Sequence, residues 1–200
     1  MSSKETILGR VRAALRDSPA VPEVPRDYRR EFDEADLERF VDRLVDYRAV
    51  VHRDDDIAGA IGRIVKTGVL VVPPGLDLSW LPSDVEVLID DGLSAEDIAA
   101  ADGVVTAAAV AVAETGTIVL DGSPDQGRRI LSLLPDLHIC VIRPNQVVAS
   151  VPEALARLDP RRPLTWISGP SATSDIELNR VEGVHGPRNL HVVLTPSGRA

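Results

Sequence analysis

The sequence predicts an α/β fold: an open, mostly parallel β-sheet flanked by helices on both faces. Short runs rich in valine and isoleucine alternate along the chain with stretches of helical periodicity. This strand-helix-strand order implies parallel pairing. An apolar content of 44% over 200 residues is enough for one substantial core. In such sheets the ligand site is expected beyond the strand ends.

The N-terminal part of the chain differs from the rest. A capping-box pair precedes apolar residues at helical intervals, which indicates a short amphipathic helix: Ser2 and Glu5, then Ile7, Val11 and Leu15. Several prolines among charged residues follow, and they favour a linker over regular structure. We therefore expect an N-terminal amphipathic helix and proline-rich linker over residues 1–32, and a single domain over residues 33–200.

Within residues 33–200 each element is expected from its own pattern. Helices are expected where apolar residues recur every three to four positions or where capping signals occur: from residue 33 to 45, 57–65, a short one opening at Ser94, 123–134 and 151–158. Strands are expected where short β-branched runs end at turn residues: residues 49–52, 69–72, 85–89, 137–142, 164–167 and 190–194.

The segment from residue 103 to 120 is ambiguous. Its alanines are compatible with a helix, whereas the flanking valines and isoleucines favour strands. Gly116 is placed to supply a turn residue of positive φ. We expect two strands here. The small side chains allow close approach by a ligand, and equally by a packed helix.

Composition excludes several classes of function. The net charge of −9, from 31 acidic and 22 basic residues, argues against general binding of nucleic acids or anionic membranes. Cys140 is the only cysteine, so the chain cannot form an internal disulfide or a cysteine-rich iron–sulfur site. Neither a signal-peptide block nor a membrane-length apolar run is seen, so a cytoplasmic protein is expected.

The first candidate site is the sequence Ala-Glu-Thr-Gly-Thr at residues 113–117. An alanine-lined strand delivers Glu114 to a turn, beside the hydroxyls of Thr115 and Thr117 and next to Gly116. Apolar surroundings raise the pKa of a carboxyl group and suit it to act as a base or nucleophile. The alternative is an ordinary solvated turn glutamate, and residue type alone favours it.

The second candidate is the hydroxyl-rich turn that follows the strand at residues 164–167. Gly169, Ser171 and Asp175 lie in it. Successive N–H groups in such a turn can hold a carboxylate or phosphate. Ser174 and Glu177 have capping-box spacing, so this segment equally fits the start of a short helix.

The third candidate is the glycine-flanked loop at residues 183–188. His185 can transfer a proton near neutral pH, and Arg188 can clamp a carboxylate through two hydrogen bonds. A simple turn is the alternative. No metal site is expected: His138 and Cys140 share one face of a strand but lack further ligands at suitable spacing.

Together, these three segments resemble a known family. The ordered set is Ala-Glu-Thr-Gly-Thr, then Gly-Pro-Ser-x-Thr-x-Asp-Ile-Glu, then Gly-Val-His-Gly-Pro-Arg. It resembles the lactate utilization protein C family, also called LutC or YkgG, which consists of a LUD domain. The resemblance covers roughly residues 35–195. The positions that match its motifs are Glu114, Thr115, Gly116, Gly169, Ser171, Asp175, His185 and Arg188.

The resemblance implies a fold similar to the NagB/RpiA/CoA-transferase group. It also implies a role in the oxidation of L-lactate to pyruvate together with iron–sulfur partner proteins, with no cofactor in this chain. On this view Glu114 and His185 are candidate catalytic residues, and the other residues of the three segments form a site for a small carboxylate. Two alternatives remain: a free-standing enzyme for a carboxylate, thioester or formyl-type substrate with Glu114 as nucleophile or base, and a regulatory or interaction module.

Overall fold

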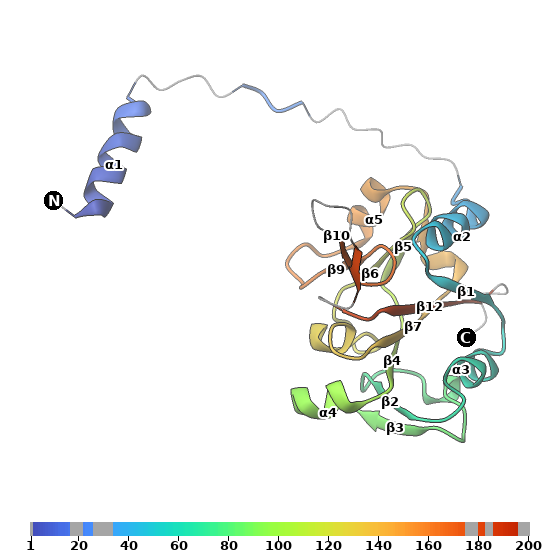
Figure 1. Cartoon of the computed structure of the whole chain (residues 1–200). Helices are drawn as coiled ribbons and strands as arrows, with labels where there is room; N and C mark the ends of the chain where they lie inside the picture. The colour runs from blue at the N-terminus through green and yellow to red at the C-terminus, as the bar shows by residue number, and fades with distance from the viewer. Residues whose placement is uncertain (1, 17–21, 26–33, 175–179, 183–185, 196–200) are drawn as a thin grey trace.

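A computed structural model describes residues 2–16, 22–25, 34–174, 180–182 and 186–195. Among these residues, the main sheet has six strands, all parallel, in the order β1-β12-β7-β4-β2-β3. Their bounds are β1 Val50–Arg53, β2 Val69–Val72, β3 Glu86–Ile89, β4 Gly103–Thr106, β7 Leu137–Ile142 and β12 Asn189–Leu194. The predicted α/β fold with parallel pairing is confirmed (Figure 1).

One face of this sheet is covered by α3 (Ile57–Val65). The helix begins at Asp56, whose side chain accepts a hydrogen bond from Gly59 N–H. Ile61 is fully buried and belongs to a cluster with Val105 and Ile139 from the central strands. These strands are apolar on both faces, as expected for a covered parallel sheet.

The opposite face is covered by helices and by a second sheet. This sheet has four strands in the order β8-β5-β6-β9, with parallel and antiparallel pairs: β5 Val110–Val112, β6 Thr117–Leu120, β8 Val147–Val148 and β9 Thr165–Ile167. Its outer side packs on α5 (Val151–Arg157), while α2 (Leu37–Asp46) and α4 (Ala95–Ala100) complete the layer. Short 3-10 helices connect these elements: η1 Leu78–Trp80, η2 Arg129–Ser132 and η3 Pro144–Gln146.

The ambiguous segment from residue 103 to 120 forms three strands, β4, β5 and β6, where we expected two. β5 and β6 pair in antiparallel register around the turn that contains Gly116. The helix α2 packs closely on the alanine-rich stretch: Ala111 and Ala113 are buried in one cluster with Phe40 and Leu44 of α2. The small side chains therefore serve close packing of α2 on the second sheet.

The predicted helix at residues 123–134 is wrong, since only η2 forms there. The Ser123 carbonyl accepts from the N–H groups of Gln126 and Gly127, which makes a tight turn. Gly127 then adopts φ +70°, outside the helical region. The carbonyls of Pro124 and Asp125 accept from Gly75 and Ala107 of neighbouring segments. Tertiary hydrogen bonds thus replace the helix that local capping signals favoured.

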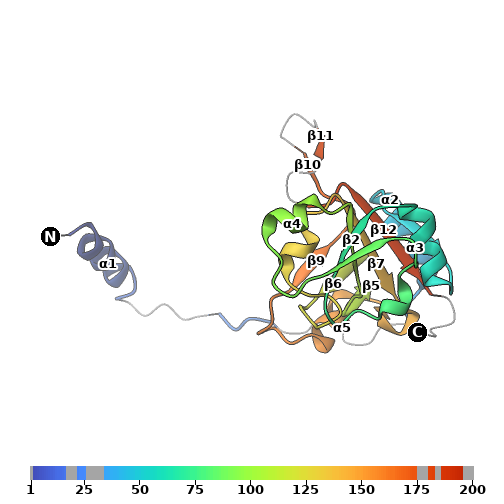
Figure 2. The same ribbon diagram turned by 90° about the horizontal axis from the view of Figure 1, so that it is seen from below.

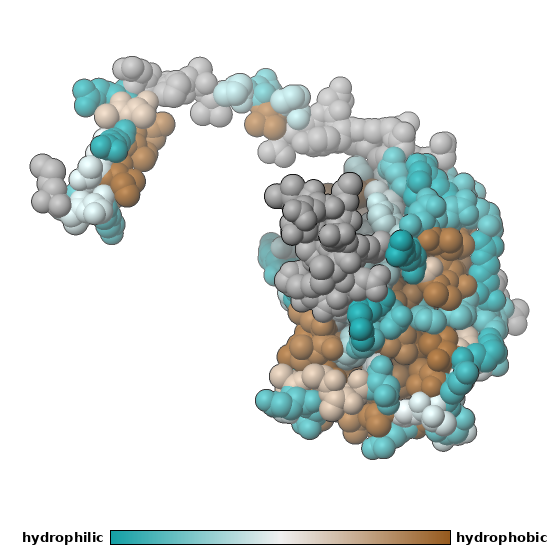
Figure 3. All heavy atoms as spheres, in the orientation of Figure 1, coloured by the Kyte–Doolittle hydropathy of each residue, from teal (hydrophilic) through white to brown (hydrophobic). Residues whose placement is uncertain are grey.

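The predicted N-terminal helix is confirmed as α1 (Ser3–Ala14), with the capping box between Ser2 and Glu5. α1 lies apart from the α/β body (Figure 1), and none of its residues is buried. Hydrophobic residues gather along one side of this helix in Figure 3, and Ile7 and Val11 are exposed. Within the described residues, no helix is long and apolar enough to cross a membrane.

A third, two-stranded sheet pairs β10 (Ala172–Ser174) with β11 (Arg180–Glu182) in antiparallel fashion. This hairpin projects from the body (Figure 2). Ser174 ends β10, and the helix weighed as an alternative for this segment would run through residues 175–179, which lie outside the described residues.

Candidate functional site

The turn between β5 and β6 holds the first predicted motif. Gly116 adopts φ +62°, and a Cβ at this position would lie 2.6 Å from the Cβ of Arg43 and 3.1 Å from the backbone nitrogen of Leu44. Two features therefore require glycine at position 116: the positive φ of the backbone and the close approach of α2. This packing role accounts for the glycine of the motif without a ligand.

Glu114 lies at the mouth of this turn and is exposed. Its carboxylate is 3.9 Å from the guanidinium of Arg39 on α2, with both side chains about half exposed. A hollow of about 310 Å³ beside it is lined by Glu114, Thr115 and three residues from α2 and its C-terminal end: Arg43, Asp46 and Tyr47. These surroundings are polar and open to solvent, whereas the sequence suggests apolar surroundings for this carboxyl group.

The two threonines of the motif connect it to the second predicted segment. Thr115 Oγ1 is 2.7 Å from Thr117 Oγ1, which is in turn 2.8 Å from Ser168 Oγ. Thr117 is buried and Ser168 directly follows β9, so a chain of hydroxyls runs from one segment to the other. The structure thus brings together parts of two motifs that are about fifty residues apart in the sequence.

Gly169 follows Ser168 and packs on the end of α2. Its φ is +83°, and a Cβ there would lie 2.7 Å from both the Cβ and the carbonyl oxygen of Tyr47. The glycines of the first two motifs therefore contact the same helix. Both allow the turns that follow β5 and β9 to pack against α2 without a side chain between them.

A cavity of about 300 Å³, here called the His138 cavity, joins the second motif to the third. Its walls come from three parts of the chain: residues 165–171, residues Gly186, Pro187 and Leu190, and the group Arg129, Leu133 and His138. The N–H of Ser171 donates to the carbonyl of Pro187 at 2.8 Å and holds two walls together. Gly169 and Ser171 line this cavity, as the predicted site requires, whereas Asp175 and His185 lie outside the described residues.

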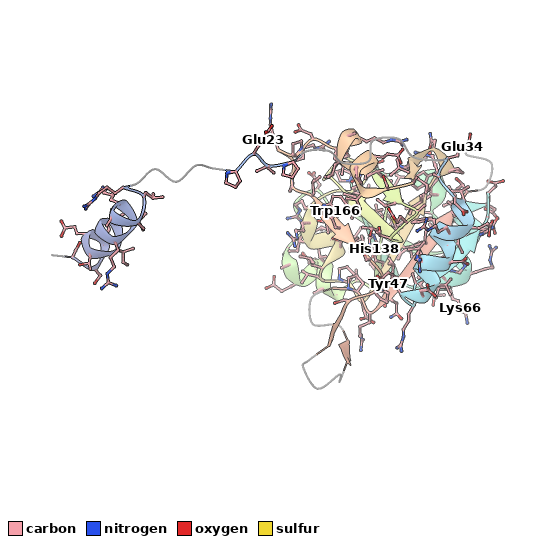
Figure 4. The ribbon with its side chains drawn as sticks, turned by 90° about the horizontal axis from the view of Figure 1, so that it is seen from above. Glu23, Glu34, Tyr47, Lys66, His138 and Trp166 are labelled. Atoms are coloured by element: carbon pink, nitrogen blue, oxygen red, sulfur yellow. The ribbon has the colours of Figure 1, made fainter. Side chains whose placement is uncertain are left out.

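His138 lies in the interior of the body, with Trp166 and Tyr47 on either side of it in Figure 4. Burial lowers the pKa of His138 to about 4, so its imidazole is neutral at pH 7. Nε2 lies 2.8 Å from Thr106 Oγ1, much closer than the 3.9 Å from that hydroxyl to Cys140 Sγ. The shorter contact favours donation by the hydroxyl to Nε2, which places the ring proton on Nδ1.

Nδ1 of His138 has no hydrogen-bond partner among the described residues. Because His138 lines the cavity, this N–H is a donor for a bound molecule. Cys140 is fully buried beside Thr106, and burial raises the pKa of its thiol to about 12. The described residues contain no group of three potential metal ligands, so His138 and Cys140 have no third ligand among them.

Arg188 is placed differently from the other predicted residues. It precedes β12, at the amino-terminal edge of the main sheet, and its guanidinium makes two hydrogen bonds to the carboxylate of Asp136, at 2.5 and 3.0 Å. This pairing lowers the pKa of Asp136. Arg188 is thus already bound to a carboxylate of the protein, and it is not among the residues that line the His138 cavity.

Arg129 and His138 are the residues of this site that the sequence did not assign to it. The sequence presents His138 only as half of an incomplete metal pair and does not mark Arg129 as a site residue. Both lie in the leucine-rich segment between the first two motifs. The register of β7 beside β12 brings Leu190 opposite His138, and this pairing is not visible in the sequence.

Residues 89–195 match the family model described as LUD domain. This range includes the second sheet and all the residues that line the His138 cavity. The chain therefore belongs to the LUD domain family. It is a homologue of lactate utilization protein C: the protein of that name from Deinococcus radiodurans is 48% identical over 166 residues, covering 79% of this chain and 78% of the relative.

Two further comparisons agree. Lactate utilization protein C from Anoxybacillus flavithermus is 37% identical over 90 residues, a match that spans 40% of the relative's length and 43% of this chain. The crystal structure of a DUF162 family protein from Deinococcus radiodurans superposes with a TM-score of 0.69 at 42% identity. That match covers 80% of this chain and 95% of the other.

Proposed function

We propose that this chain is a cytoplasmic subunit of a lactate-oxidising system and acts with iron–sulfur partner proteins in the conversion of L-lactate to pyruvate. The observation that supports this most is the 48% identity to a lactate utilization protein C over 79% of the chain. The single buried cysteine is consistent with clusters held by partners, because one thiol cannot ligate a cluster alone.

Within this role, the His138 cavity is the site we propose for a small carboxylate. Its polar wall includes His138 Nδ1–H, the guanidinium of Arg129, and the side chain of Ser171. The neutral imidazole of His138 can donate to a carboxylate without the cost of burying a charge on the ring, and the guanidinium of Arg129 supplies the positive charge. A cavity of about 300 Å³ is ample for a three-carbon acid.

The remaining predicted residues have supporting places in this proposal. Thr115 and Thr117 hold Ser168 through the hydroxyl chain, and Gly116 allows the turn to pack on α2. Asp175 and His185 lie outside the described residues, and Arg188 is paired with Asp136, so contact of these three residues with a ligand stays a prediction. So does kinship with the NagB/RpiA/CoA-transferase group, which a comparison of sheet order with members of that group would test.

The role is tested by removing the chain from cells that grow on lactate. Deletion should abolish growth on L-lactate and lactate oxidation in anaerobic extracts, and leave growth on pyruvate intact. Affinity purification of the intact protein from the same cells should recover proteins with the absorbance of iron–sulfur clusters. Unchanged lactate oxidation after deletion would refute the proposal.

The site is tested in the purified chain. Binding of L-lactate and pyruvate is followed by the fluorescence of Trp166, which lines the cavity and is partly exposed. His138→Gln and Ser171→Ala should weaken the response, while the matched changes His52→Gln and Ser79→Ala, outside the cavity, should not. Equal binding by all four variants would place the carboxylate elsewhere.

A free-standing enzyme that uses Glu114 is the rival function. Its support in the structure is weak, because Glu114 is exposed, faces Arg39, and lines a different hollow from Ser171. A base or nucleophile accounts for a rate factor of about a hundred or more. Full activity of purified Glu114→Gln would therefore exclude this rival.

An assembly role for α1 is compatible with the subunit proposal. The helix exposes Ile7, Val11 and Leu15 along one side, and apolar stripes of this kind bind partner grooves. Removal of residues 1–30 should then abolish recovery of partner proteins, while circular dichroism and thermal unfolding of the α/β body stay unchanged. Full recovery would show that the helix is dispensable for assembly.

A further inference from the structure

A second cavity, of about 500 Å³, adjoins the His138 cavity and is larger than it. We call it the Gln126 cavity. Its walls come from the loops after β2 and β3, residues 120–132 and the start of β9: Pro74, Asp90, Leu120, Gly122, Ser123, Pro124, Gln126, Gly127, Arg128, Arg129, Ser132, Pro163 and Thr165. Arg129 and Thr165 line both cavities, so the two lie side by side.

The Gln126 cavity lies where the strand order of the sheet reverses. From β2 the chain proceeds outward to β3, whereas β4, β7 and β12 follow one another in the other direction. The loops beyond the carboxyl ends of β2 and β4 therefore diverge, which is where open α/β sheets bind ligands. Hydrogen bonds from Gly75 and Ala107 to the carbonyls of Pro124 and Asp125 fix the segment that occupies this point.

Two adjacent arginines line this cavity, and they differ in how the described residues bind them. Arg128 donates from Nε to Asp90 at 2.8 Å, from Nη2 to the other oxygen of Asp90, and to the carbonyl of Leu93 at 3.0 Å. The Asp90 side chain is 1% exposed, so this pair is a fixed part of the wall. Within the described part of the chain, the guanidinium of Arg129 has neither an acidic nor a hydrogen-bonding partner.

A buried amide adds a second donor. Gln126 is 4% exposed, and its Oε1 accepts from the N–H of Asp121 at 2.6 Å. This bond orients the amide and leaves Nε2 with no partner among the described residues. In the described part of the chain Nε2 is not among the fully buried side-chain atoms that lack a partner, so it reaches the open space of the cavity and can donate to an acceptor there.

The rest of the wall is largely apolar, with Pro74, Leu120 and Pro163 among its residues. Ligand sites typically combine such walls with a few polar groups in volumes of about 300–1,000 Å³. The guanidinium of Arg129 and the amide of Gln126 favour an anionic group, and the apolar walls favour an apolar body. We therefore expect a ligand that combines the two. The chain has a net charge of −9, so attraction of anions here is local to Arg129.

We propose that the Gln126 cavity is a second binding site, which takes an organic anion whose carboxylate or phosphate binds Arg129 and Gln126 while its apolar body contacts Pro74, Leu120 and Pro163. This site shares Arg129 with the proposed lactate-sized site in the His138 cavity, whereas Gln126, Pro74, Leu120 and Pro163 line the Gln126 cavity and not the other. Its ligand is larger than a three-carbon acid, because the volume and apolar walls exceed what such an acid fills.

The test is a titration of the ¹⁵N-labelled full chain, followed by amide chemical shifts. The probes are benzoate, phenyl phosphate and, as the uncharged match, benzamide. At least one anion should give saturable shifts at Gly122, Gln126 and Gly127, and benzamide should give none. Tighter binding of benzoate assigns the site to a carboxylate, and tighter binding of phenyl phosphate assigns it to a phosphate.

Variants decide whether Arg129 supplies the affinity. Arg129→Gln should raise the dissociation constant about 10- to 100-fold, as expected for loss of a charge-assisted hydrogen bond. Arg129→Lys should retain more affinity than Arg129→Gln. Arg10→Gln in α1 changes the net charge equally and should bind as the unchanged protein does.

The proposal would be overturned by no saturable shift with either anion, by equal shifts with benzamide, or by unchanged binding by Arg129→Gln. Shifts confined to Gly169 and Ser171 would also overturn it, because they would place the anion in the His138 cavity. This titration does not measure growth on lactate. A negative result would therefore overturn the second binding site and leave the proposed function to be decided by the deletion experiment.

Discussion

The backbone of Gly116 lies directly against Arg43 of α2: a Cβ on Gly116 would be 2.6 Å from the Cβ and 2.9 Å from the carbonyl carbon of Arg43. Gly169 approaches Tyr47 in the same way, with a distance of 2.7 Å. The two motif glycines thus allow the turns after β5 and β9 to pack closely against one helix. The proposed carboxylate site is built on this packing.

Gly116→Ala is expected to destabilise the protein by about 2–4 kcal/mol, because positive φ and steric overlap with α2 add. The control is Gly92→Ala: Gly92 has φ +85°, but a Cβ there would meet no atom within 4 Å, so only backbone strain applies, about 1 kcal/mol. Urea unfolding followed by circular dichroism measures both. Equal losses would show that contact with α2 contributes nothing.

His138 should make stability depend on pH. Burial lowers its pKa from 6.5 to about 4, so the unfolded chain binds more protons between these values and stability falls as the pH falls through this window. From pH 7 to pH 5 the loss attributable to His138 is about 2 kcal/mol. Urea unfolding of His138→Gln should show a loss smaller by that amount. Parallel pH profiles of the two proteins would contradict the prediction.

Asp90→Asn should destabilise the protein by about 2 kcal/mol, because it breaks the ion pair between the buried carboxylate of Asp90 and the half-exposed guanidinium of Arg128. Hydrogen bonding to Arg128 lowers the pKa of Asp90, so its contribution is present above the ordinary carboxyl range and is lost as the pH falls below about 4. Exposed Asp91 offers the control Asp91→Asn, which should change unfolding little. If Asp90→Asn and Asp91→Asn lowered the free energy of unfolding equally, the Asp90–Arg128 pair would not be stabilising.

Thr117→Val removes the central hydroxyl of the chain from Thr115 to Ser168 and keeps the side-chain shape. A loss of about 1 kcal/mol in stability is expected from the broken hydrogen bonds. Pyruvate binding followed by Trp166 fluorescence should weaken as well, because Ser168 and the adjacent Gly169 lose their support. Thr67→Val, at an exposed position, is the control. Unchanged binding by Thr117→Val would separate the hydroxyl chain from the site.

Local pattern was a good guide where an element depends on its own residues. The capping boxes at Ser2 and Ser94 begin helices as predicted, and the β-branched runs at residues 69–72 and 137–142 form central strands. It failed at residues 123–134, where the same kind of capping signal precedes a turn. There the backbone carbonyls bind Gly75 and Ala107, which local sequence does not reveal.

Periodicity, turn chemistry and ordered motifs were enough to predict the α/β class, the parallel pairing, the family and the strand-turn-strand unit at residues 113–117. Which motif residues meet became visible in the folded protein. The tertiary structure separates Glu114 from Ser171, pairs Arg188 with Asp136, and brings Arg129 and His138 to the cavity. Contacts between distant segments depend on strand order and register, and these are set by packing of the whole core.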